Sequence, residues 1–367
     1  MTNKAKKASI DIIIVNYHSA DDTGAAIAAL YPWPYGKIIV VDNSADGDAT
    51  AKLEKVLEQF PNTLTVIAQE NLGFANGCNL AFDRSQSEHI LLLNPDASIS
   101  TASIIKMSQT LSAQPNAAAV TPNIFWDKAK KFFLPTALPP TPLAQCKSAL
   151  AFRFPTIGRY LGLRYCRQQR RMLRNKNVLN VPFVTGAILL LKREAISKAK
   201  GLFDPRFFMF YEDSDLSLRL RHCGFKLLLD TQAEGQHSYR HKSYKLPMME
   251  QTRAAYFDKN YPRLTTLGNW LKRQKLVPRV APWEDWKSLA TAPVASLEQL
   301  AEELGEAPRI VALSPSPAMV PSLISVNEHG TLLDEKDWEC LEPGRYMAYV
   351  RLKKQHQGAF WLTINKA

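Results

Sequence analysis

The sequence predicts an α/β fold built on a mostly parallel sheet with helices on both faces, followed by a small C-terminal α/β module. Short apolar, β-branched runs alternate with helical patterns from about residue 9 to residue 111. Such alternation is typical of βαβ units in a parallel sheet. The C-terminal module is indicated by a change in charge: residues 284–367 have a net charge of −4, whereas residues 1–283 have +16.

The first half of the chain contains four expected strands and four expected helices. Strands are predicted at 10–15, 37–41, 64–68 and 89–93, and helices at about 23–30, 49–60, 74–83 and 101–111. In a sheet of this kind ligands bind at the carboxyl ends of the strands. The candidate functional residues therefore follow the strands directly: Asn16 and Tyr17, Asp42 and Asn43, residues 71–73, and residues 94–96.

An insertion at about residues 134–176 interrupts this pattern. A Pro-rich connection is followed by a segment from Arg153 to Lys176 that holds eight basic residues and no acidic one. A loose helical stripe predicts an amphipathic basic helix; it consists of Ile157, Leu161, Tyr165, Gln169 and Met172. Three interpretations remain open: a solvated face packed on the domain, a surface for an anionic membrane, or a site for acceptor phosphate. Nucleic acid is not expected.

The remaining chain is expected to contain a second core region and the module. Residues 177–195 predict a strand, a turn and a strand, residues 210–225 a helix with Gly224 at its C-terminus, and residues 226–230 a strand. We place the domain boundary at 283/284. In the module, residues 296–307 predict a helix, and residues 309–313, 346–352 and 359–364 predict strands. No motif there indicates a chemical role.

Composition excludes several classes of protein. The five cysteines form no C-x-x-C pair, so neither a disulfide framework nor a zinc ribbon is expected. The basic N-terminus leads into a short apolar run that predicts a strand rather than a signal peptide. No apolar run approaches the length of a membrane span. The net charge of +12 favours anionic partners, and we expect a cytoplasmic protein.

Three acidic or histidine-containing segments carry the candidate chemistry, and each has a simpler structural interpretation. Asp96 fits ordinary turn chemistry or a site for Mg²⁺ or Mn²⁺ that bridges a diphosphate. Asp213, in the acidic run at 212–215, fits a helix N-cap or a general base whose pKa the preceding aromatic residues raise. His237, with His241 four residues later, fits a packed imidazole or a metal or phosphate ligand.

Seven segments together resemble inverting glycosyltransferases of family 2, rhamnosyltransferase-like branch. They occur in the family's order between about residues 9 and 245, which makes the combination specific. The segments are DIIIVNYHS, IIVVDNSADGD, NLGFANGCN, LLLNPDA, VTGAILLLKREA, FDPRFFMFYEDSDLSLRLRHCGFKLLL and HSYRHKS. The resemblance implies the GT-A fold, which has a Rossmann-like sheet, and a hexosyltransferase-type enzyme that uses a nucleotide-diphosphate sugar. The residues after about 284 lie outside it.

The resemblance also implies roles for individual residues. The catalytic residues would be Asp213, as general base, and Glu212; Gly186 and Asp215 would line the pocket for the sugar and the acceptor. Asp96 and His237 would bind Mn²⁺ or Mg²⁺. The residue at the first position of the family's DxD motif is Asn94, so Asp96 would act with less help. The residues implied in donor binding are Asn16, Tyr17, Asp42, Asn43, Gly73, Phe74, Asn76, Asn94 and Asp96.

The expected function is inverting, metal-dependent transfer of a sugar from a dTDP-, UDP- or GDP-sugar. The expected acceptor is a hydroxyl of a growing surface polysaccharide, such as lipopolysaccharide, or of a phosphate-bearing lipid-linked glycan. We expect peripheral attachment to the cytoplasmic face of the membrane. A nicotinamide dehydrogenase or a nucleotidyltransferase would need a Gly-rich loop after the first strand, and residues 15–24 lack it. The alternative is a catalytically silent nucleotide- or glycan-binding module of a polysaccharide assembly complex, which donor hydrolysis with Mn²⁺ would distinguish.

Overall fold

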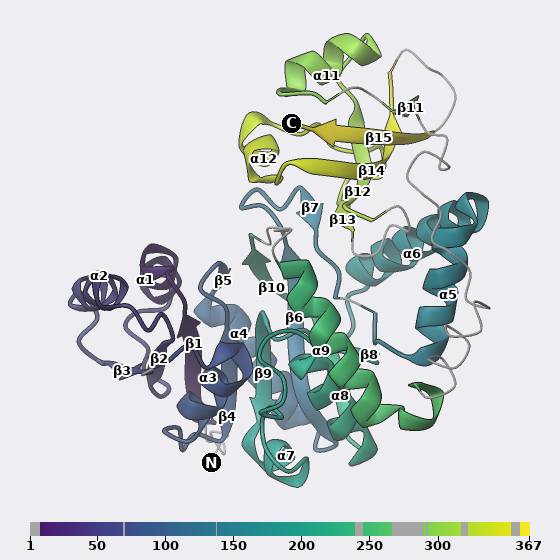
Figure 1. Cartoon of the computed structure of the whole chain (residues 1–367). Coiled ribbons are helices and arrows are strands. Elements are labelled where there is room, and N and C mark those ends of the chain that lie inside the picture. Colours follow the sequence, from purple (N-terminus) through teal and green to yellow (C-terminus); the bar gives the residue numbers. More distant parts are fainter. Residues whose placement is uncertain are drawn as a thin grey trace, which may run out of the picture. The chain divides into compact units, whose positions relative to one another are not determined.

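The chain forms two compact units in the computed structural model (Figure 1), which describes residues 8–68, 70–136, 138–238, 245–265, 289–290, 293–316, 322–353 and 360–367. The first unit comprises residues 1–123, 176–237 and 246–260, and the second comprises residues 124–175, 238–245 and 261–367. The insertion at 134–176, which the sequence assigned to the first domain, thus lies in the second unit. The predicted boundary at 283/284 lies outside the described residues and stays a prediction.

The first unit is built on a mostly parallel sheet. Its strand order is β6-β9-β4-β1-β2-β3, in which β4, β1, β2 and β3 are parallel and β9 is antiparallel to both β4 and β6. Strand β10 pairs with β5, β6 and β8. The strands are β1 (Ile10–Asn16), β2 (Ile38–Asp42), β3 (Thr63–Ile67), β4 (His89–Leu93), β5 (Ala97–Ile99), β6 (Ala117–Phe125), β8 (Leu179–Val181), β9 (Ile188–Lys192) and β10 (Lys226–His237).

Helices cover this sheet and begin where the sequence supplies N-caps. Asp46 accepts a hydrogen bond from Ala49 N, and Ser100 accepts one from Ser103 N, so each caps a helix. The helices are α1 (Ala20–Ala28), α2 (Gly47–Leu57), α3 (Gly73–Phe82), α4 (Thr101–Ala113), α7 (Arg193–Lys198), α8 (Glu212–His222) and α9 (Lys245–Asn260). All strands and helices predicted for residues 9–111 are present, with ends shifted by a few residues.

The fully buried strands explain why this sheet forms. Every residue of β1, β2 and β4 is buried, which is the burial expected of parallel strands covered on both faces. Register also aligns their carboxyl ends, because Asn16 of β1 pairs with Asp42 of β2. The sheet therefore brings the polar residues that follow its strands to one edge.

The second unit contains a smaller sheet of strand order β11-β15-β14-β12-β13-β7. The helix and the three strands predicted for the module are present, whereas α5, β13 and α12 were not predicted. Helices α5 and α6 form a hairpin (Figure 1). The elements are β7 (Phe132–Phe133), α5 (Pro142–Arg153), α6 (Pro155–Arg174), β11 (Leu289–Ala290), α11 (Leu297–Leu304), β12 (Arg309–Ser314), β13 (Leu323–Ser325), α12 (Glu335–Cys340), β14 (Gly344–Arg351) and β15 (Phe360–Lys366).

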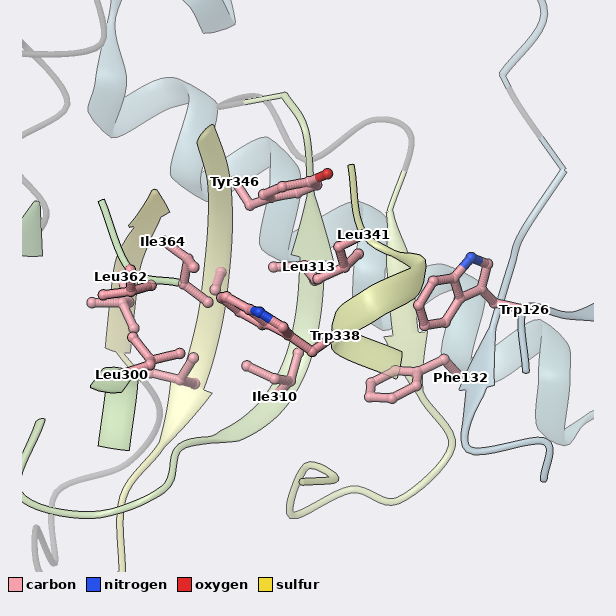
Figure 2. Packing of buried hydrophobic residues seen from close by; sticks show 13 residues of the cluster. Trp126, Phe132, Leu300, Ile310, Leu313, Trp338, Leu341, Tyr346, Leu362 and Ile364 are labelled. Carbon is pink, nitrogen blue, oxygen red and sulfur yellow. The ribbon is translucent and has the colours of Figure 1, made fainter. Parts of the chain in front are cut away.

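The core of the second unit explains why residues before the insertion belong to it. In Figure 2 the indole of Trp338 lies among apolar side chains of the sheet, such as Ile310, and its ring nitrogen donates to Ala295 O at 3.2 Å. Trp126 and Phe132 belong to the same buried cluster. These two side chains supply apolar surface that the C-terminal residues alone do not provide.

One face of α6 packs against the same sheet. Tyr165 and Cys166 form a buried cluster with residues of β12, β13 and β14, and Arg170 donates to the carbonyl oxygens of Val311 at 3.4 Å and Ser325 at 3.2 Å.

Within the described part of the chain, no helix is both long enough and apolar enough to cross a membrane.

Truncation of Trp338 tests the assignment of this core. Trp338→Ala should lower the free energy of unfolding of the second unit by about 3 to 5 kcal/mol, because it removes a large buried side chain and leaves a cavity. Urea denaturation followed by circular dichroism measures the change. Leu332→Ala, at a residue that is 45% exposed, is the control and should cost far less. Equal effects of the two substitutions would contradict the assignment.

Candidate active site

At the carboxyl ends of β1 and β2, Asn16 and Asp42 bind each other. Asn16 Nδ2 donates to Asp42 Oδ1 at 3.0 Å, and Ser44 Oγ and Thr50 Oγ1 donate to the same carboxylate at 2.7 Å and 2.5 Å. Burial raises the pKa of Asp42, but the hydrogen bonds from Thr50, Asn16 and Ser44 outweigh it, so the pKa is lowered and the group is ionised. Both side chains are fully buried. Tyr17, the next residue after Asn16, is 53% exposed.

A tight turn at residues 71–73 is tied to the end of β2 by Asn43. The Asn43 amide donates to Asn71 Oδ1 at 3.0 Å and to Gly73 O at 3.1 Å, and it accepts from Leu72 N at 2.9 Å. Gly73 has a φ of +75°, and a Cβ at this position would lie 2.2 Å from Phe208 O. Only glycine fits both the backbone conformation and this close approach.

The aromatic loop before α8 is bonded to α3. Asn79 Nδ2 donates to Phe203 O and Phe203 N donates to Asn79 Oδ1, both at 3.0 Å, while Asn76 Nδ2 donates to Pro205 O at 3.4 Å. Residues about 130 positions apart in sequence are thus held together. The amide of Asn76 also donates to Leu72 O, so its side chain serves the fold.

The candidate base, Asp213, lies in the first turn of α8 beside Gly186. Gly186 N donates to Asp213 Oδ2 at 3.3 Å. A Cβ at Gly186 would lie 3.5 Å from Phe74 Cε1 and 4.0 Å from Asp213 Cβ. Three segments that the sequence predicted to act together therefore meet at this point.

Burial raises the proton affinity of the Asp213 carboxylate. It raises the pKa of Asp213 to about 6, against hydrogen bonds from Gly186 and Ser214 that lower it. The predicted rise in pKa is confirmed. Asp213 remains partly exposed, which is what a group that exchanges protons with an acceptor requires.

The neighbouring acid, Glu212, is in a different state. It is 6% exposed, and its Oε2 is buried without a hydrogen-bond partner. Burial is the main cause, and the negative charge of Asp213 the second, of a pKa of Glu212 well above its usual value. Burial therefore shifts Glu212 toward its protonated form.

The other half of the candidate site is formed by Asp96 and His237. His237 Nε2 lies 3.1 Å from Asp96 Oδ1, because His237 at the end of β10 pairs with Ala97 in β5. Asp96 is 40% exposed and His237 is 11% exposed in their side chains. Nearby in the chain, the side-chain oxygen of Asn94 is buried without a partner. His241 and Ser243 lie outside the described residues.

The two halves are joined through consecutive residues. Gly186 N donates to Asp213, and Asn94 N donates to the carbonyl oxygen of the next residue, Ala187, at 2.9 Å. Asp96 follows Asn94 by two positions. The base and the Asp96–His237 pair therefore lie at the same edge of the sheet.

The residues at this edge fit a divalent cation that is only partly bound by protein. Among the described residues, no group of three or more His, Cys, Asp or Glu side chains is arranged so that it could hold a metal ion. However, Mg²⁺ and similar ions commonly take one or two carboxylates from the protein and the rest of their ligands from water and phosphate. The Asp96 carboxylate and the His237 imidazole lie together as such a partial set, and the unpartnered Asn94 oxygen belongs to the residue two positions before Asp96.

Asp215, which was predicted to line the pocket, is instead engaged by cations. Its fully buried carboxylate lies 2.8 Å from Arg219 Nε and 2.6 Å from Lys259 Nζ. Lys259 also contacts Asp204 at 2.6 Å. The sequence analysis missed this network, although the four-residue spacing of Asp215 and Arg219 could have suggested a helical ion pair.

This network holds the segment that delivers the base. The Arg219 guanidinium also donates to the carbonyl oxygens of Ala199, Gly201 and Leu202 at 2.6 to 2.8 Å. Phe210 and Tyr211, directly before Glu212, both have positive φ values, 71° and 65°. Such conformations are unfavourable for these residues and persist only where the surroundings impose them.

Comparison with known proteins identifies the family of the chain. The family model described as glycosyltransferase like family 2 matches residues 8–257. The chain belongs to glycosyltransferase family 2. The glycosyltransferase is thus an enzyme of that family, and the predicted fold class is confirmed: a mostly parallel sheet surrounded by helices, the GT-A arrangement.

Among curated relatives, the glycosyltransferase is 25% identical over 222 residues to N-acetylglucosaminyl-diphospho-decaprenol L-rhamnosyltransferase of Mycobacterium tuberculosis, which covers 57% of this chain and 69% of the relative. Two solved structures are similar. Mannosyltransferase PcManGT from Pyrobaculum calidifontis, in complex with GDP-Man and Mn²⁺, has a TM-score of 0.46 at 15% identity over 66% of this chain. GalNAc-T7 with UDP, GalNAc and Mn²⁺ has a TM-score of 0.48 at 13% identity over 84% of this chain. The glycosyltransferase spans 60% of each of these two chains.

Stability at different pH values tests the environment of Asp213. Its pKa in the folded state, about 6, exceeds the value near 4 of an unfolded chain. The folded wild-type protein therefore becomes less stable as the pH rises through 6. At pH 8, Asp213→Asn should melt at a higher temperature than the wild type. The gain should shrink between pH 6 and pH 4 and be absent below pH 4. Thermal unfolding across this range measures it.

Asp204→Asn is the control of opposite sign. Hydrogen bonds from Arg206, together with Lys259, lower the pKa of Asp204, so the ionised group stabilises the fold above pH 4. Its replacement should lower the melting temperature at pH 8. An Asp213→Asn variant that is also destabilised at pH 8 would contradict the environment described for Asp213.

Proposed function

We propose that the glycosyltransferase transfers a sugar, with inversion at the anomeric carbon, from a nucleotide-diphosphate donor to a hydroxyl of a lipid-linked glycan or growing surface polysaccharide. The observation that carries this proposal is the position of Asp213, whose carboxylate accepts from Gly186 N at the edge where Asp96 and His237 also lie. Burial raises the pKa of Asp213 to about 6, close to the pH at which the base must act.

The reaction needs one carboxylate. As the acceptor oxygen forms its bond to the anomeric carbon, the bond from that carbon to the diphosphate oxygen breaks, and its electron pair leaves with the nucleoside diphosphate. The acceptor's proton passes to Asp213. Glu212 is buried and its raised pKa favours the protonated form, so we assign it an indirect role: it limits the negative charge beside Asp213. Attack from the opposite face, without a carboxylate nucleophile, gives inversion.

Asp96 and His237, with the Asn94 oxygen, would hold Mn²⁺ or Mg²⁺. When bound, the cation neutralises charge on the leaving diphosphate. Asn94 in place of a first acid reduces the negative charge of the site. We therefore expect the metal to bind weakly without the nucleotide and more tightly with it.

The remaining predicted donor residues divide by their accessibility. The exposed ring of Tyr17 is available to a nucleoside. Gly73 and Phe74 form the start of α3, where Gly73 N donates to Asn71 Oδ1 and Ala75 N donates to Phe208 O, so we assign this turn the shaping of the donor site. Asn16, Asp42, Asn43 and Asn76 are bonded to the protein itself, so we assign them the positioning of these groups. Asp215 would position α8 rather than contact the sugar.

The curated relative's name describes transfer of L-rhamnose to N-acetylglucosaminyl-diphospho-decaprenol. We propose an acceptor of the same kind, a glycan attached through phosphate to a lipid, and a place of action at the cytoplasmic face of the membrane. The net charge of +12 suits an acceptor that carries phosphate.

Nucleotide binding tests the donor and the metal. UDP, dTDP, GDP and CMP, each with and without Mn²⁺, should be compared by thermal shift, since a ligand of the folded state raises its melting temperature. One nucleoside diphosphate should give the largest shift, and Mn²⁺ should increase it. Asp96→Asn should remove the increase, whereas Asp48→Asn, at an exposed position of α2, should leave it unchanged. Shifts independent of Mn²⁺ in the wild type would contradict the proposed metal site.

The pH dependence of turnover tests the base. The kcat/KM of the wild type should fall tenfold per pH unit below about pH 6, because Asp213 is then protonated. Asp213→Asn should lower kcat on the order of 10²-fold or more and abolish this dependence. Sugar transfer measured by mass spectrometry provides the rates, and Asp48→Asn is again the control. Wild-type-like turnover in Asp213→Asn would exclude Asp213 as the base.

A further inference from the structure

Exposed apolar side chains are concentrated on the α5–α6 hairpin. Among the described residues, thirteen large hydrophobic side chains are exposed, and six of them fall between residues 138 and 160. These six are Leu138, Leu143, Leu150, Phe154, Ile157 and Tyr160. Most of the described residues of helix α5 are exposed, three near its start are half-buried, and Ala151 is buried. Two of the six, Leu143 at 64% and Tyr160 at 63%, are the most exposed of the thirteen.

Helix α6 has two opposite faces. Its buried residues, which include Tyr165, Cys166 and Gln169, point toward the sheet of the second unit. At 100° per residue, Ile157, Tyr160 and the following arginines lie on the other side of the helix. The predicted stripe is therefore divided: Tyr165 and Gln169 are buried in the second unit, whereas Ile157 belongs to the exposed face.

The exposed face continues from apolar to basic along the helix. Arg164, Arg167 and Arg171 are exposed and follow Ile157 and Tyr160 on the same side. Residues 138–176 contain nine basic residues and no acidic one. Arg170 and Arg174 are bound within the second unit, the first to backbone carbonyls and the second to Glu328, so they contribute less to this surface.

We propose that the exposed face of α5 and α6 docks onto an anionic lipid bilayer, with Leu143, Leu150, Phe154 and Tyr160 in the interface and the arginines on lipid phosphates. Apolar side chains next to arginines on one face are the pattern of helices that lie in a membrane surface. Charge complementarity favours anionic lipid, and the exposed leucines favour a bilayer over a soluble phosphate, which would leave them in water. This surface goes beyond the proposed function and does not depend on which sugar is transferred.

Vesicle binding of the full chain tests the surface without any donor. The protein should sediment with vesicles of phosphatidylcholine and phosphatidylglycerol, and much less with phosphatidylcholine alone. Arg164→Gln/Arg167→Gln/Arg171→Gln should weaken binding about 10²-fold, since each charge near an anionic surface contributes about fivefold. Leu150→Ser/Phe154→Ser/Tyr160→Ser should weaken it at least about tenfold. Circular dichroism should show that both variants are folded.

Matched variants elsewhere serve as controls. Val326→Ser/Leu332→Ser changes exposed apolar residues of the second unit, and Arg221→Gln/Lys226→Gln/Lys336→Gln removes three exposed charges. Both should bind vesicles like the wild type. Absence of vesicle binding would overturn the proposal, as would equal losses in the controls. Loss in the arginine variant with none in the apolar variant would also overturn it, because it would indicate a phosphate or nucleic-acid site. The nucleotide thermal shifts are a separate measurement, so failure of the membrane surface and failure of the proposed function can be distinguished.

Discussion

The hydrogen bond from Gly186 N–H to the Asp213 carboxylate is the contact on which the site depends. It fixes the first turn of α8 against the residues that lead into β9. The next carbonyl along, that of Ala187, accepts from Asn94 N and so fixes the end of β4 against the same segment. Because two consecutive residues bind Asp213 on one side and the end of β4 on the other, backbone geometry sets the separation between Asp213, the proposed base, and residues 94–96, where we propose that the leaving group binds. A backbone of this kind leaves little freedom for either carboxylate to move.

The site contains three acidic side chains whose surroundings differ, and their pKa values differ as a result. Donors from the protein lower the pKa of Asp42, whereas burial raises the pKa of Glu212 well above its usual value and that of Asp213 to about 6. The pKa of Asp213 therefore lies close to neutral pH. Lys259 and Arg219 bind Asp215 in the same first turn of α8, and this helix is held in place although Phe210 and Tyr211 enter it with unfavourable backbone conformations.

Much of this arrangement could be predicted from the sequence, and the exceptions have physical reasons. Periodicity predicted the strands of the first sheet, and the rule that ligands bind at the carboxyl ends of parallel strands pointed to residues 94–96. The meeting of Gly186, Phe74 and Asp213 depends on pairing between remote segments, which no local pattern encodes. Helix α5 was missed because prolines around residue 140 were taken as a connection, yet Thr141 caps the helix and Pro142 occupies its first turn. Trp126 and Phe132 belong to the core of the second unit, and this also depends on tertiary packing, which the sequence pattern does not show.

The most direct test of the site is the distance between a cation bound at Asp96 and the amide of Gly186. In ¹⁵N-labelled protein with a nucleoside diphosphate, Mn²⁺ should broaden the Gly186 amide resonance strongly. It should broaden Ile90, near the other end of β4, much less, since about four residues of extended strand separate Ile90 from Asn94. Asp96→Asn should restore the Gly186 signal at the same Mn²⁺ concentration. A Gly186 resonance that stays sharp while Mn²⁺ broadens residues elsewhere would show that the cation and the base do not share a site, and would contradict the account.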